Sequence, residues 1–448
     1  MKNAVTVESP ISHTAPPVEL PPTQSLFAQR GRLCVLALCV ILAIGTFLRL
    51  PQALFTGDHA ALAALQSVHP RPAYPTIGFD EDLYRQYVES LEKHGLGSYP
   101  DLVERYREIQ TKLAGSILPP VRFLFILSGY MWRSLFGNDA LSALTDVASL
   151  FGILTLGLAV LFAWRIRGLG FAVIIAAFTA FAPTQLHMSQ HALVDGFFTF
   201  WALLSLWLLW ENLRAPHSWK WLAGYVAALV LLVLTKENSF FVWIAFLALL
   251  LANRWFSFGT VTRELVIATA LGPFLGIIVL IFLAGGIGDL IATYQLSITK
   301  NYTLKYAIMT GDGPWHRYLV DLLMVSPVIL LLALGGLFML RRQDRTEWFF
   351  VVFIAASYLV MCNVKYGMNL RYANMWDVPL RILAASSILT LSAKLPRYRQ
   401  IATIAAVGLV CIVEFRQYII LFVNYPLYEL VTEGLLRALK ILKTPMVR

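Results

Sequence analysis

Three consecutive carboxylates, Asp80, Glu81 and Asp82, follow soon after the first long apolar segment of the chain. Carboxylates are suited to acid or base work, and these lie where chemistry at a membrane surface would need them. They stand at the start of a predicted helix, where the helix dipole stabilises negative charge. Capping alone explains one of the three acids, but it does not so readily explain all three.

Three further charged residues interrupt apolar sequence. Asp195 precedes a predicted helix, where it is either paired or a helix cap. An isolated Lys236 on the outer side opposes the usual charge bias, so we expect an anionic partner, either a lipid phosphate or Glu237. Arg371 offers a planar fork suited to phosphate, and the alternative is an interfacial arginine that reaches toward headgroups.

Histidine and cysteine give weaker signals. The four outer histidines could join carboxylates around a metal, but their spacing matches no specific ligand pattern. One of them, His316, follows Trp315 in a segment that could form an aromatic platform over a substrate, although interfacial aromatic residues also occur without a ligand. The four cysteines lie in or beside apolar runs and indicate neither disulfides nor a metal site. The histidines are His69, His187, His191 and His316.

Composition defines the class of protein that must position these groups. The chain has 448 residues, of which 58% are hydrophobic and only 14% charged, whereas soluble domains average about 25% charged. Apolar runs of roughly 17–23 residues recur, near the length that crosses a bilayer. The net charge of +10 is explained by basic links on the cytoplasmic side, so nucleic acid is not expected as a partner. The sequence therefore predicts an all-α polytopic membrane protein.

The basic links predict the topology. Five short links between apolar runs carry two or three basic residues each, so we expect them in the cytoplasm and the carboxylates on the opposite side. We expect about eleven spans, with boundaries uncertain by about two to four residues. The predicted spans are 33–50, 142–163, 171–186, 196–211, 219–234, 238–253, 264–285, 320–340, 347–362, 375–392 and 401–422.

One apolar segment, 121–136, must not span if the later basic links are to stay inside. We expect it to lie along the outer interface with Arg122 and Arg133 reaching toward headgroups. The preceding loop has helical periodicity in two stretches, which predicts two amphipathic helices on the outer surface. The expected apolar faces are Leu83, Tyr84, Tyr87, Val88 and Leu91 in the first, and Leu102, Val103, Tyr106, Ile109 and Leu113 in the second.

The predicted organisation has three parts. Residues 1–29 are proline-rich and read as a disordered cytoplasmic tail. Residues 30–422 form one transmembrane domain, within which 51–141 is the outer loop with its interfacial helices. Residues 423–448 form a C-terminal interfacial segment.

At this point several short motifs, in this order, resemble the GT-C class of membrane glycosyltransferases. The resemblance covers about 50–420 and is strongest in 50–240. Within the class, the chain is similar to the branch of protein O-mannosyltransferases and aminoarabinose transferases, which use polyprenyl-phosphate sugars. The motifs are Leu48-Arg49-Leu50, Phe79-Asp80-Glu81 with Tyr84, Leu118-Pro119-Pro120, Leu135-Phe136-Gly137, Ala182-Pro183, Asp195, Thr235-Lys236 and Arg371-Tyr372.

The resemblance implies transfer of a sugar from a lipid-phosphate carrier to an acceptor hydroxyl of a protein, lipid or glycan, with inversion at the anomeric carbon. Asp80 would be the general base. Glu81 and Asp195 would orient a substrate or, with His191, hold a divalent ion such as Mg or Mn. Lys236 and Arg371 would bind the phosphate, with Tyr84, Tyr372 and His316 as further substrate-binding candidates. Such an enzyme would sit in a bacterial inner membrane with its site facing the periplasm.

The pattern also departs from that family. Asp82 is not part of the usual Asp-Glu pair, and Gly115-Ser-Ile-Leu118 stands where relatives often carry a polar or charged residue. Two other classes remain as alternatives. A transporter or flippase for a lipid-linked substrate would also be polytopic, but we find no obvious repeat and no strong charge near the middle of a predicted span. A noncatalytic scaffold would not need acids at 80, 81 and 195 on one face.

Overall fold

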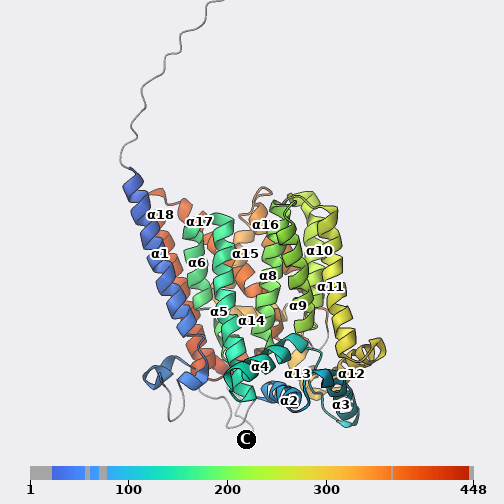
Figure 1. Ribbon diagram of the computed structural model, residues 1–448. Helices are drawn as coiled ribbons and strands as arrows, with labels where there is room; N and C mark the ends of the chain where they lie inside the picture. Colours follow the sequence, from blue (N-terminus) through green and yellow to red (C-terminus); the bar gives the residue numbers. More distant parts are fainter. Residues whose placement is uncertain (1–22, 56–60, 70–77, 365–366, 443–448) are drawn as a thin grey trace, which may run out of the picture.

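The computed structural model describes residues 23–55, 61–69, 78–364 and 367–442 (Figure 1). These residues are almost entirely helical and contain no strand. Residues 1–22 of the predicted tail 1–29, residues 443–448 of the predicted segment 423–448, and parts of the outer loop lie outside the described residues. Helix α1 begins at Thr23, inside the stretch predicted to be a tail.

The long helices run side by side as one bundle (Figure 1). They follow the apolar runs of the sequence, and each of the predicted spans coincides with one or two of them. The bundle helices are α1 (Thr23–Phe47), α5 (Ala140–Arg167), α6 (Leu169–Ala180), α7 (Pro183–Ser189), α8 (Val194–Arg214), α9 (Trp219–Thr235), α10 (Ser239–Phe256), α11 (Arg263–Leu283), α14 (Arg317–Val325), α15 (Pro327–Leu337), α16 (Arg345–Met361), α17 (Asp377–Ala393) and α18 (Arg399–Tyr418).

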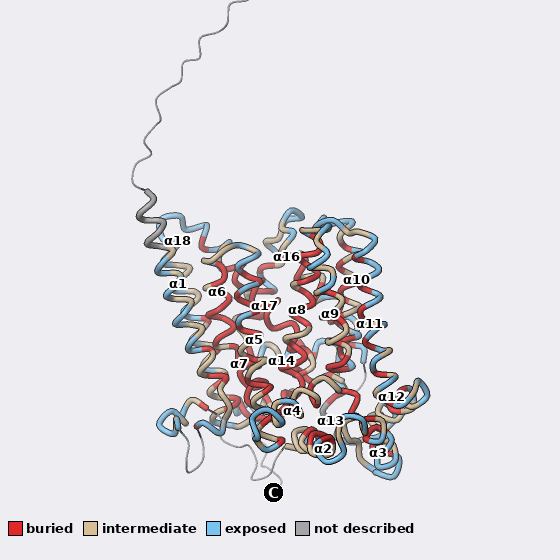
Figure 2. The backbone as a smooth tube through the Cα atoms, in the orientation of Figure 1, coloured by how far each residue is buried: buried red, intermediate tan, exposed pale blue. Residues whose placement is uncertain are grey.

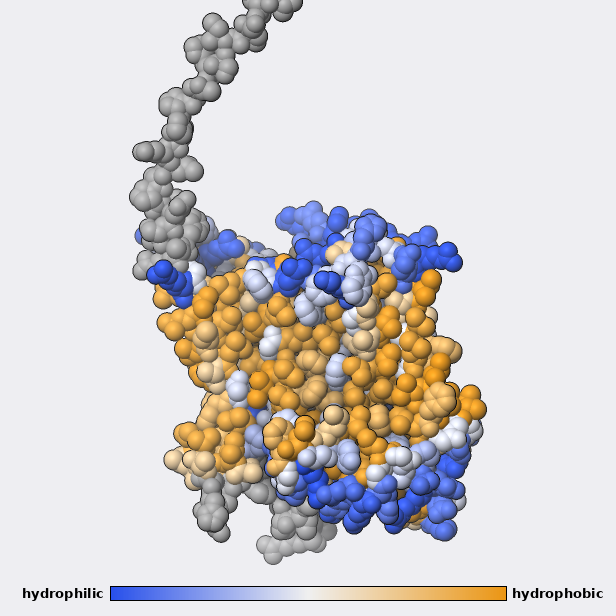
Figure 3. Space-filling view, in the orientation of Figure 1, coloured by the Kyte–Doolittle hydropathy of each residue, from blue (hydrophilic) through white to orange (hydrophobic). Residues whose placement is uncertain are grey.

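Among the described residues, five helical segments are long and apolar enough to cross a membrane, and a sixth is added if the bent pair α6 and α7 counts as one span. The helices at the other predicted spans are not among these, so the number eleven stays a prediction. Figure 3 shows a broad hydrophobic band across the face of the bundle in view, with hydrophilic residues gathered at its two ends. A band of this kind is the surface that a bilayer requires. The all-α polytopic membrane architecture is thereby confirmed.

Shorter helices gather at one end of the bundle, the lower end in Figure 1. Proline, glycine and polar residues interrupt the apolar pattern here, so the helices stay short. The elements of this kind in the chain are η1 (Gln52–Leu54), η2 (Ala63–Val68), α2 (Phe79–His94), η3 (Leu96–Ser98), α3 (Tyr99–Lys112), α4 (Phe123–Phe136), α12 (Ile287–Thr303), α13 (Lys305–Gly311), η4 (Leu370–Trp376), η6 (Ile419–Asn424) and α19 (Thr432–Ala438). At the opposite end, η5 (Pro396–Tyr398) connects α17 to α18.

The predicted apolar face of α2 is confirmed, since all five of its residues are buried. That of α3 is confirmed only in its first part, because Ile109 and Leu113 are exposed while Gln110 is buried. Gln110 turns inward because its amide donates to the Gly115 carbonyl and accepts from the Ile117 amide. Together with α4 and the nearby ends of α5 and α8, these faces form a second hydrophobic core beside that of the bundle. Figure 2 shows this burial within the lower end.

The expected roles of two arginines in 121–136 are corrected. Arg122 is buried and pairs with Glu237, while its Nη1 donates a 2.7 Å hydrogen bond to Tyr84. Arg133 forms an ion pair with Glu92 at 2.7 Å. Both cations therefore hold protein elements together. Helix α4, with 14 residues, lies beside α2 at the lower end (Figure 1), and its place relative to a bilayer stays a prediction.

Charge does occur inside the predicted spans, contrary to the sequence analysis. Arg381 of α17 binds Asp377 at 2.9 Å and Glu414 of α18 at 2.7 Å. Arg381 and Glu414 are wholly buried. Sequence inspection missed this pair because it crosses between two helices that are each apolar on average.

Candidate active site

The first turn of α2 sends its three carboxylates in different directions. Asp80 and Glu81 turn toward the bundle, whereas Asp82 accepts hydrogen bonds from Arg85 and Gln86 on the same helix. Gly78 precedes the helix, and a Cβ at that position would lie 2.7 Å from Glu81 Oε2 and 2.8 Å from the Tyr428 ring. The absence of a side chain at residue 78 thus allows α2 to begin close to the bundle.

Glu81 fixes the start of α2 to the turn between α7 and α8. Its Oε1 accepts a 2.9 Å hydrogen bond from the Ala192 amide and lies 3.2 Å from His191 Nδ1. Burial alone would raise the pKa of Glu81, but His191 and the amide hydrogen bonds outweigh it, and the pKa is lowered. The turn itself follows a break of 63° between α6 and α7, where Pro183 begins the second helix.

Asp195 and Lys236 form a buried ion pair beside this turn. Lys236 Nζ lies 2.5 Å from Asp195 Oδ1, and both side chains are at most 3% exposed. Asp195 belongs to the first turn of α8, and Lys236 lies in the link between α9 and α10. The expected anionic partner of Lys236 is therefore Asp195 and not Glu237, which pairs with Arg122.

Arg371 joins the two groups of acids. Its Nη2 donates a 2.9 Å hydrogen bond to Asp80, and its Nε lies 3.7 Å from Asp195 Oδ2. Its Nη1 lies 3.4 Å from Glu429 Oε1. Since the Arg371 side chain is 4% exposed, the alternative of an arginine that reaches toward headgroups is excluded. Burial alone would lower the pKa of Arg371. The attraction of the three carboxylates outweighs burial and raises this pKa above its ordinary value.

Aromatic rings line the same cations. Lys236 Nζ lies 4.0 Å from the centre of the Tyr372 ring, and the Arg371 guanidinium carbon lies 5.8 Å from that centre and 5.9 Å from that of Tyr428. Ring faces attract cations, most strongly where water is excluded. Burial raises the pKa of Tyr372 to about 12, so its hydroxyl stays protonated at neutral pH. Tyr372 therefore supports Lys236 without adding a charge.

Of the eight residues predicted for catalysis or substrate binding, the structure brings six into one cluster and leaves two outside it. The side chain of Tyr84, a residue of α2, is wholly buried and accepts a hydrogen bond from Arg122. His316 is exposed at the start of α14 and meets the edge of Trp315. Among the described residues, no contact joins His316 to the cluster. The six are Asp80, Glu81, Asp195, Lys236, Arg371 and Tyr372.

The candidate metal ligands do not form a metal site. Glu81 and His191 are paired with each other, and Asp195 is bound by Lys236 and Arg371. Within the described residues, no three carboxylate, histidine or cysteine side chains are grouped so as to hold an ion. A divalent ion would need the carboxylate oxygens that these side chains already bind, so the residues present fit such an ion poorly. No catalytic step is therefore assigned to a metal.

The segment after the last predicted span contributes to the cluster, which sequence reasoning missed. Glu429 contacts Arg371 and accepts a 2.5 Å hydrogen bond from Asn369. The carbonyl oxygen of Tyr428 lies 3.0 Å from His187 Nε2, and the Tyr428 ring meets His191 edge-on. No spacing along the chain relates residues 428 and 429 to Asp80, so the sequence carried no signal for them.

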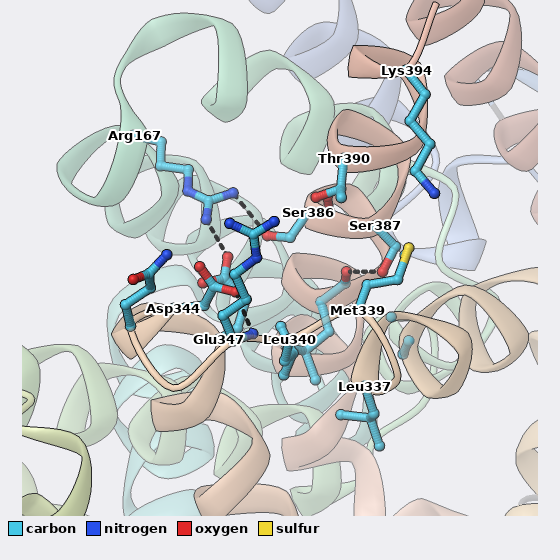
Figure 4. A pocket seen from close by; sticks show the side chains of 15 residues that line it. Arg167, Leu337, Met339, Leu340, Asp344, Glu347, Ser386, Ser387, Thr390 and Lys394 are labelled. Atoms are coloured by element: carbon cyan, nitrogen blue, oxygen red, sulfur yellow. Dashed lines mark hydrogen bonds and ion pairs between the residues drawn. The ribbon is translucent and has the colours of Figure 1, made fainter.

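A cavity of about 440 Å³ lies elsewhere, lined by the last residues of α5 and α17 and the link between α15 and α16. Figure 4 shows Arg167 of this cavity bound to Glu347 and Ser386. At this end of the bundle Glu211 of α8 binds Arg165. Asp195 lies in the first turn of α8, 16 residues before Glu211, which corresponds to about 24 Å along a helix. The cavity is therefore separate from the cluster around Arg371.

Comparisons with known proteins agree with the resemblance. Residues 113–287, less than half of the chain, match the family model of dolichyl-phosphate-mannose-protein mannosyltransferases. None of the curated proteins compared with the chain matches it.

Solved structures share the fold at low sequence identity. ArnT from Cupriavidus metallidurans in the apo state is 14% identical with a TM-score of 0.50, and the match covers 88% of this chain and 76% of that one. The apo oligosaccharyltransferase of Archaeoglobus fulgidus is 12% identical with a TM-score of 0.55, over 86% of this chain and 56% of that one. Its complex with an inhibitory peptide and a dolichol-phosphate is 13% identical, with a TM-score of 0.54, over 87% of this chain and 55% of that one. The chain thus spans little more than half of the archaeal enzyme, and together these matches show that it shares the fold of ArnT and of this oligosaccharyltransferase.

Proposed function

We propose that this protein transfers a sugar from a polyprenyl-phosphate carrier to a hydroxyl acceptor on the outer side of a bacterial inner membrane, with inversion. The observation that carries the proposal is the convergence on Arg371 of acids from α2 and α8, with Lys236 alongside. A base and a phosphate clamp must share one site for this reaction. The partial match to mannosyltransferases and the dolichol-phosphate in the archaeal complex support the type of donor.

In this proposal the two cations bind the donor phosphate. Arg371 presents a planar fork for two phosphate oxygens, and Lys236 adds a point charge beside it. Negative charge grows on the phosphate as the glycosidic bond breaks, and both cations stabilise it. Because they are already held by Asp195 and the Tyr372 ring, little reorganisation is needed at that moment.

Asp80 is the proposed general base. It is 15% exposed, more than Asp195, and it hydrogen-bonds the guanidinium that receives the phosphate. With the phosphate bound at Arg371, Asp80 accepts the proton of the attacking hydroxyl. Glu81 is a positioning residue, because its bonds to Ala192 and His191 fix the turn of α2 that carries Asp80.

The test is transfer of labelled mannose from dolichyl phosphate mannose, with a panel of peptide, lipid and glycan acceptors, by the full chain in vesicles. We expect Asp80→Asn to lower kcat about 10²- to 10⁴-fold, the range for loss of a general base. Asp82→Asn is the matched control, because Asp82 faces away from Arg371, and it should retain nearly full activity. Equal activity in Asp80→Asn would remove Asp80 as the base.

A transporter or flippase is the second candidate, and one observation favours it. The buried Arg381–Glu414 pair lies inside the predicted spans, where ionisable residues often mark a transport path. Flux of a labelled polyprenyl-phosphate sugar across vesicles, without transfer to any acceptor on the panel, would support transport. Transfer that depends on Asp80 would reject it as the main activity.

A further inference from the structure

Arg371 is held unevenly by its three carboxylates. Nη2 makes a hydrogen bond to Asp80, whereas Nε and Nη1 are buried without a hydrogen bond in the described structure. The acids nearest to these two atoms, Asp195 and Glu429, remain 3.7 and 3.4 Å away. Nε and Nη1 could therefore each donate a shorter, better-aligned hydrogen bond to a phosphate oxygen.

The three carboxylates also differ in how firmly they are anchored. Asp195 has Lys236 at 2.5 Å, and Asp80 belongs to the first turn of a helix. Glu429 lies in the non-helical stretch between η6 and α19, and its side chain is 23% exposed. The short hydrogen bond that Glu429 accepts comes from the neutral side-chain amide of Asn369. Of the three, Glu429 is the carboxylate that can leave at the smallest cost.

Charge balance gives a reason for it to leave. Arg371 and Lys236 supply two positive charges, and Asp80, Asp195 and Glu429 supply three negative ones. A donor phosphate would add another negative charge to a site with little water, where like charges repel strongly. Withdrawal of one carboxylate returns the site to the net charge that it had before the donor bound. The backbone can stay in place meanwhile, because the Leu370 amide donates to the Leu430 carbonyl at 3.2 Å.

We propose that Glu429 is an exchangeable counter-ion: it occupies part of the phosphate position at Arg371 in the donor-free protein, and its side chain swings away when the carrier phosphate binds. This inference rests on the proposed function, because it takes the phosphate at Arg371 from there. Glu429 thereby limits binding to ligands whose phosphate outcompetes a carboxylate, and it keeps a buried guanidinium neutralised between turnovers.

The proposal has a consequence for pH. Burial raises the pKa of Glu429, Arg371 lowers it, and Asp80 and Asp195 raise it further, with a net increase. These charged groups face Glu429 from η4, α2 and α8, together with the Asn369 amide. Once protonated, Glu429 no longer competes with the ligand phosphate for Arg371, so its effect on ligand binding should fade as the pH is lowered.

The experiment measures the Kd of dolichyl phosphate for the full chain in nanodiscs between neutral and mildly acidic pH. Gln at 429 can still accept the Asn369 hydrogen bond but carries no charge, so we expect E429Q to bind about fivefold more tightly at neutral pH, as befits removal of one partly screened like charge. The difference from wild type should shrink as the pH falls. Comparison at each pH cancels the titration of the ligand itself.

Two controls separate charge from packing. Glu433 carries the same charge in the same segment but pairs with Arg437 on α19, and E433Q should leave the Kd unchanged. E429A should also tighten binding. If Glu429 only packs the segment, E429A would weaken binding and E429Q would match wild type, which overturns the proposal. Tighter binding by E433Q as well would indicate a general charge effect and would also overturn it.

A failure of the proposed function would give a different binding result from a failure of the Glu429 exchange. Wild-type protein that is folded but does not bind dolichyl phosphate would overturn both proposals. Wild-type binding that is lost in R371Q and unchanged in E429Q would support the phosphate site and reject only the exchange of Glu429.

Discussion

Lys236 and Asp195 exemplify how the site places full charges where water is scarce. Removing one partner of such a pair leaves the other uncompensated, which typically costs about 3–5 kcal/mol. We therefore expect Lys236→Ala to lower the free energy of unfolding by about this amount. Thermal and denaturant unfolding in detergent would measure it.

A double-mutant cycle tests the cause. The pair Lys236→Ala and Asp195→Ala should lose less stability than the sum of the single variants, because neither charge is then left alone. Lys300→Ala is the control, since the half-buried Lys300 side chain donates a hydrogen bond to the neutral Leu113 carbonyl. Additive losses would show that the two side chains do not stabilise each other.

Glu81 predicts a dependence of stability on pH. Its pKa is lower in the folded protein than the ordinary value of 4.5. Its stabilising effect is therefore fully present above the ordinary value and is lost as the pH falls through the lowered one. Wild type should lose stability in this acidic range more steeply than Glu81→Gln. Parallel pH profiles of the melting temperature for the two proteins would contradict the assignment.

The sequence pointed to the charged residues of the cluster around Arg371 better than to their partners. Asp80, Asp195, Lys236 and Arg371 stand out because charge is rare beside apolar runs. Their pairing could not be predicted, since Lys236 has an adjacent Glu237 yet binds Asp195, 41 residues away. Glu429 was missed altogether, because only the folded chain brings it to Arg371.

At the scale of elements, glycine determines how closely α9 and α11 pack. A Cβ at Gly272 would lie 2.6 Å from the Leu229 Cβ and 3.2 Å from the Val226 carbonyl oxygen. Small residues allow this approach between membrane helices. We expect Gly272→Ala to destabilise the protein by about 1–3 kcal/mol, the usual cost of overpacking.

The matched control is Gly157→Ala on α5, where a Cβ meets nothing within 4 Å. Alanine favours a helix over glycine, so this variant should be neutral or slightly more stable. Thermal unfolding in the same detergent compares the two. Equal melting temperatures would show that α9 and α11 can move apart at no cost.

Amphipathic periodicity predicted α2 completely because its whole apolar face is covered by α4 and α5. It predicted the end of α3 wrongly, since Ile109 and Leu113 are exposed there. Periodicity identifies which face is apolar, but tertiary packing decides how far along the helix that face is covered. The positions of Gln110 and Arg122 likewise depend on partners distant in sequence.

For the whole molecule, the sidedness of the bundle can be tested directly. In a variant without native cysteines, Glu104→Cys on the exposed side of α3 should react with an impermeant thiol reagent added to intact cells. Arg397→Cys, in the link that precedes α18, should react only after permeabilisation. The opposite result would place the cluster around Arg371 on the cytoplasmic side.

Composition and charge bias were enough to predict a helical membrane bundle, because a bilayer admits few alternatives. They did not predict the bend between α6 and α7 or the ion pair of Arg381 with Glu414. Both depend on contacts between helices, on which hydropathy alone carries no information.

The chain order of the cluster has a consequence for biosynthesis. Asp80 and Arg371 are 291 residues apart, and Glu429 follows the last of the long helices. During synthesis the acids of α2 emerge long before their cationic partner, and Arg371 emerges before Glu429. The nascent chain must therefore hold unpaired charges at the membrane surface until nearly all of it has been inserted. A ribosome-bound intermediate that ends before residue 371 should be a preferred client of chaperones, and it would have no catalytic capacity of its own.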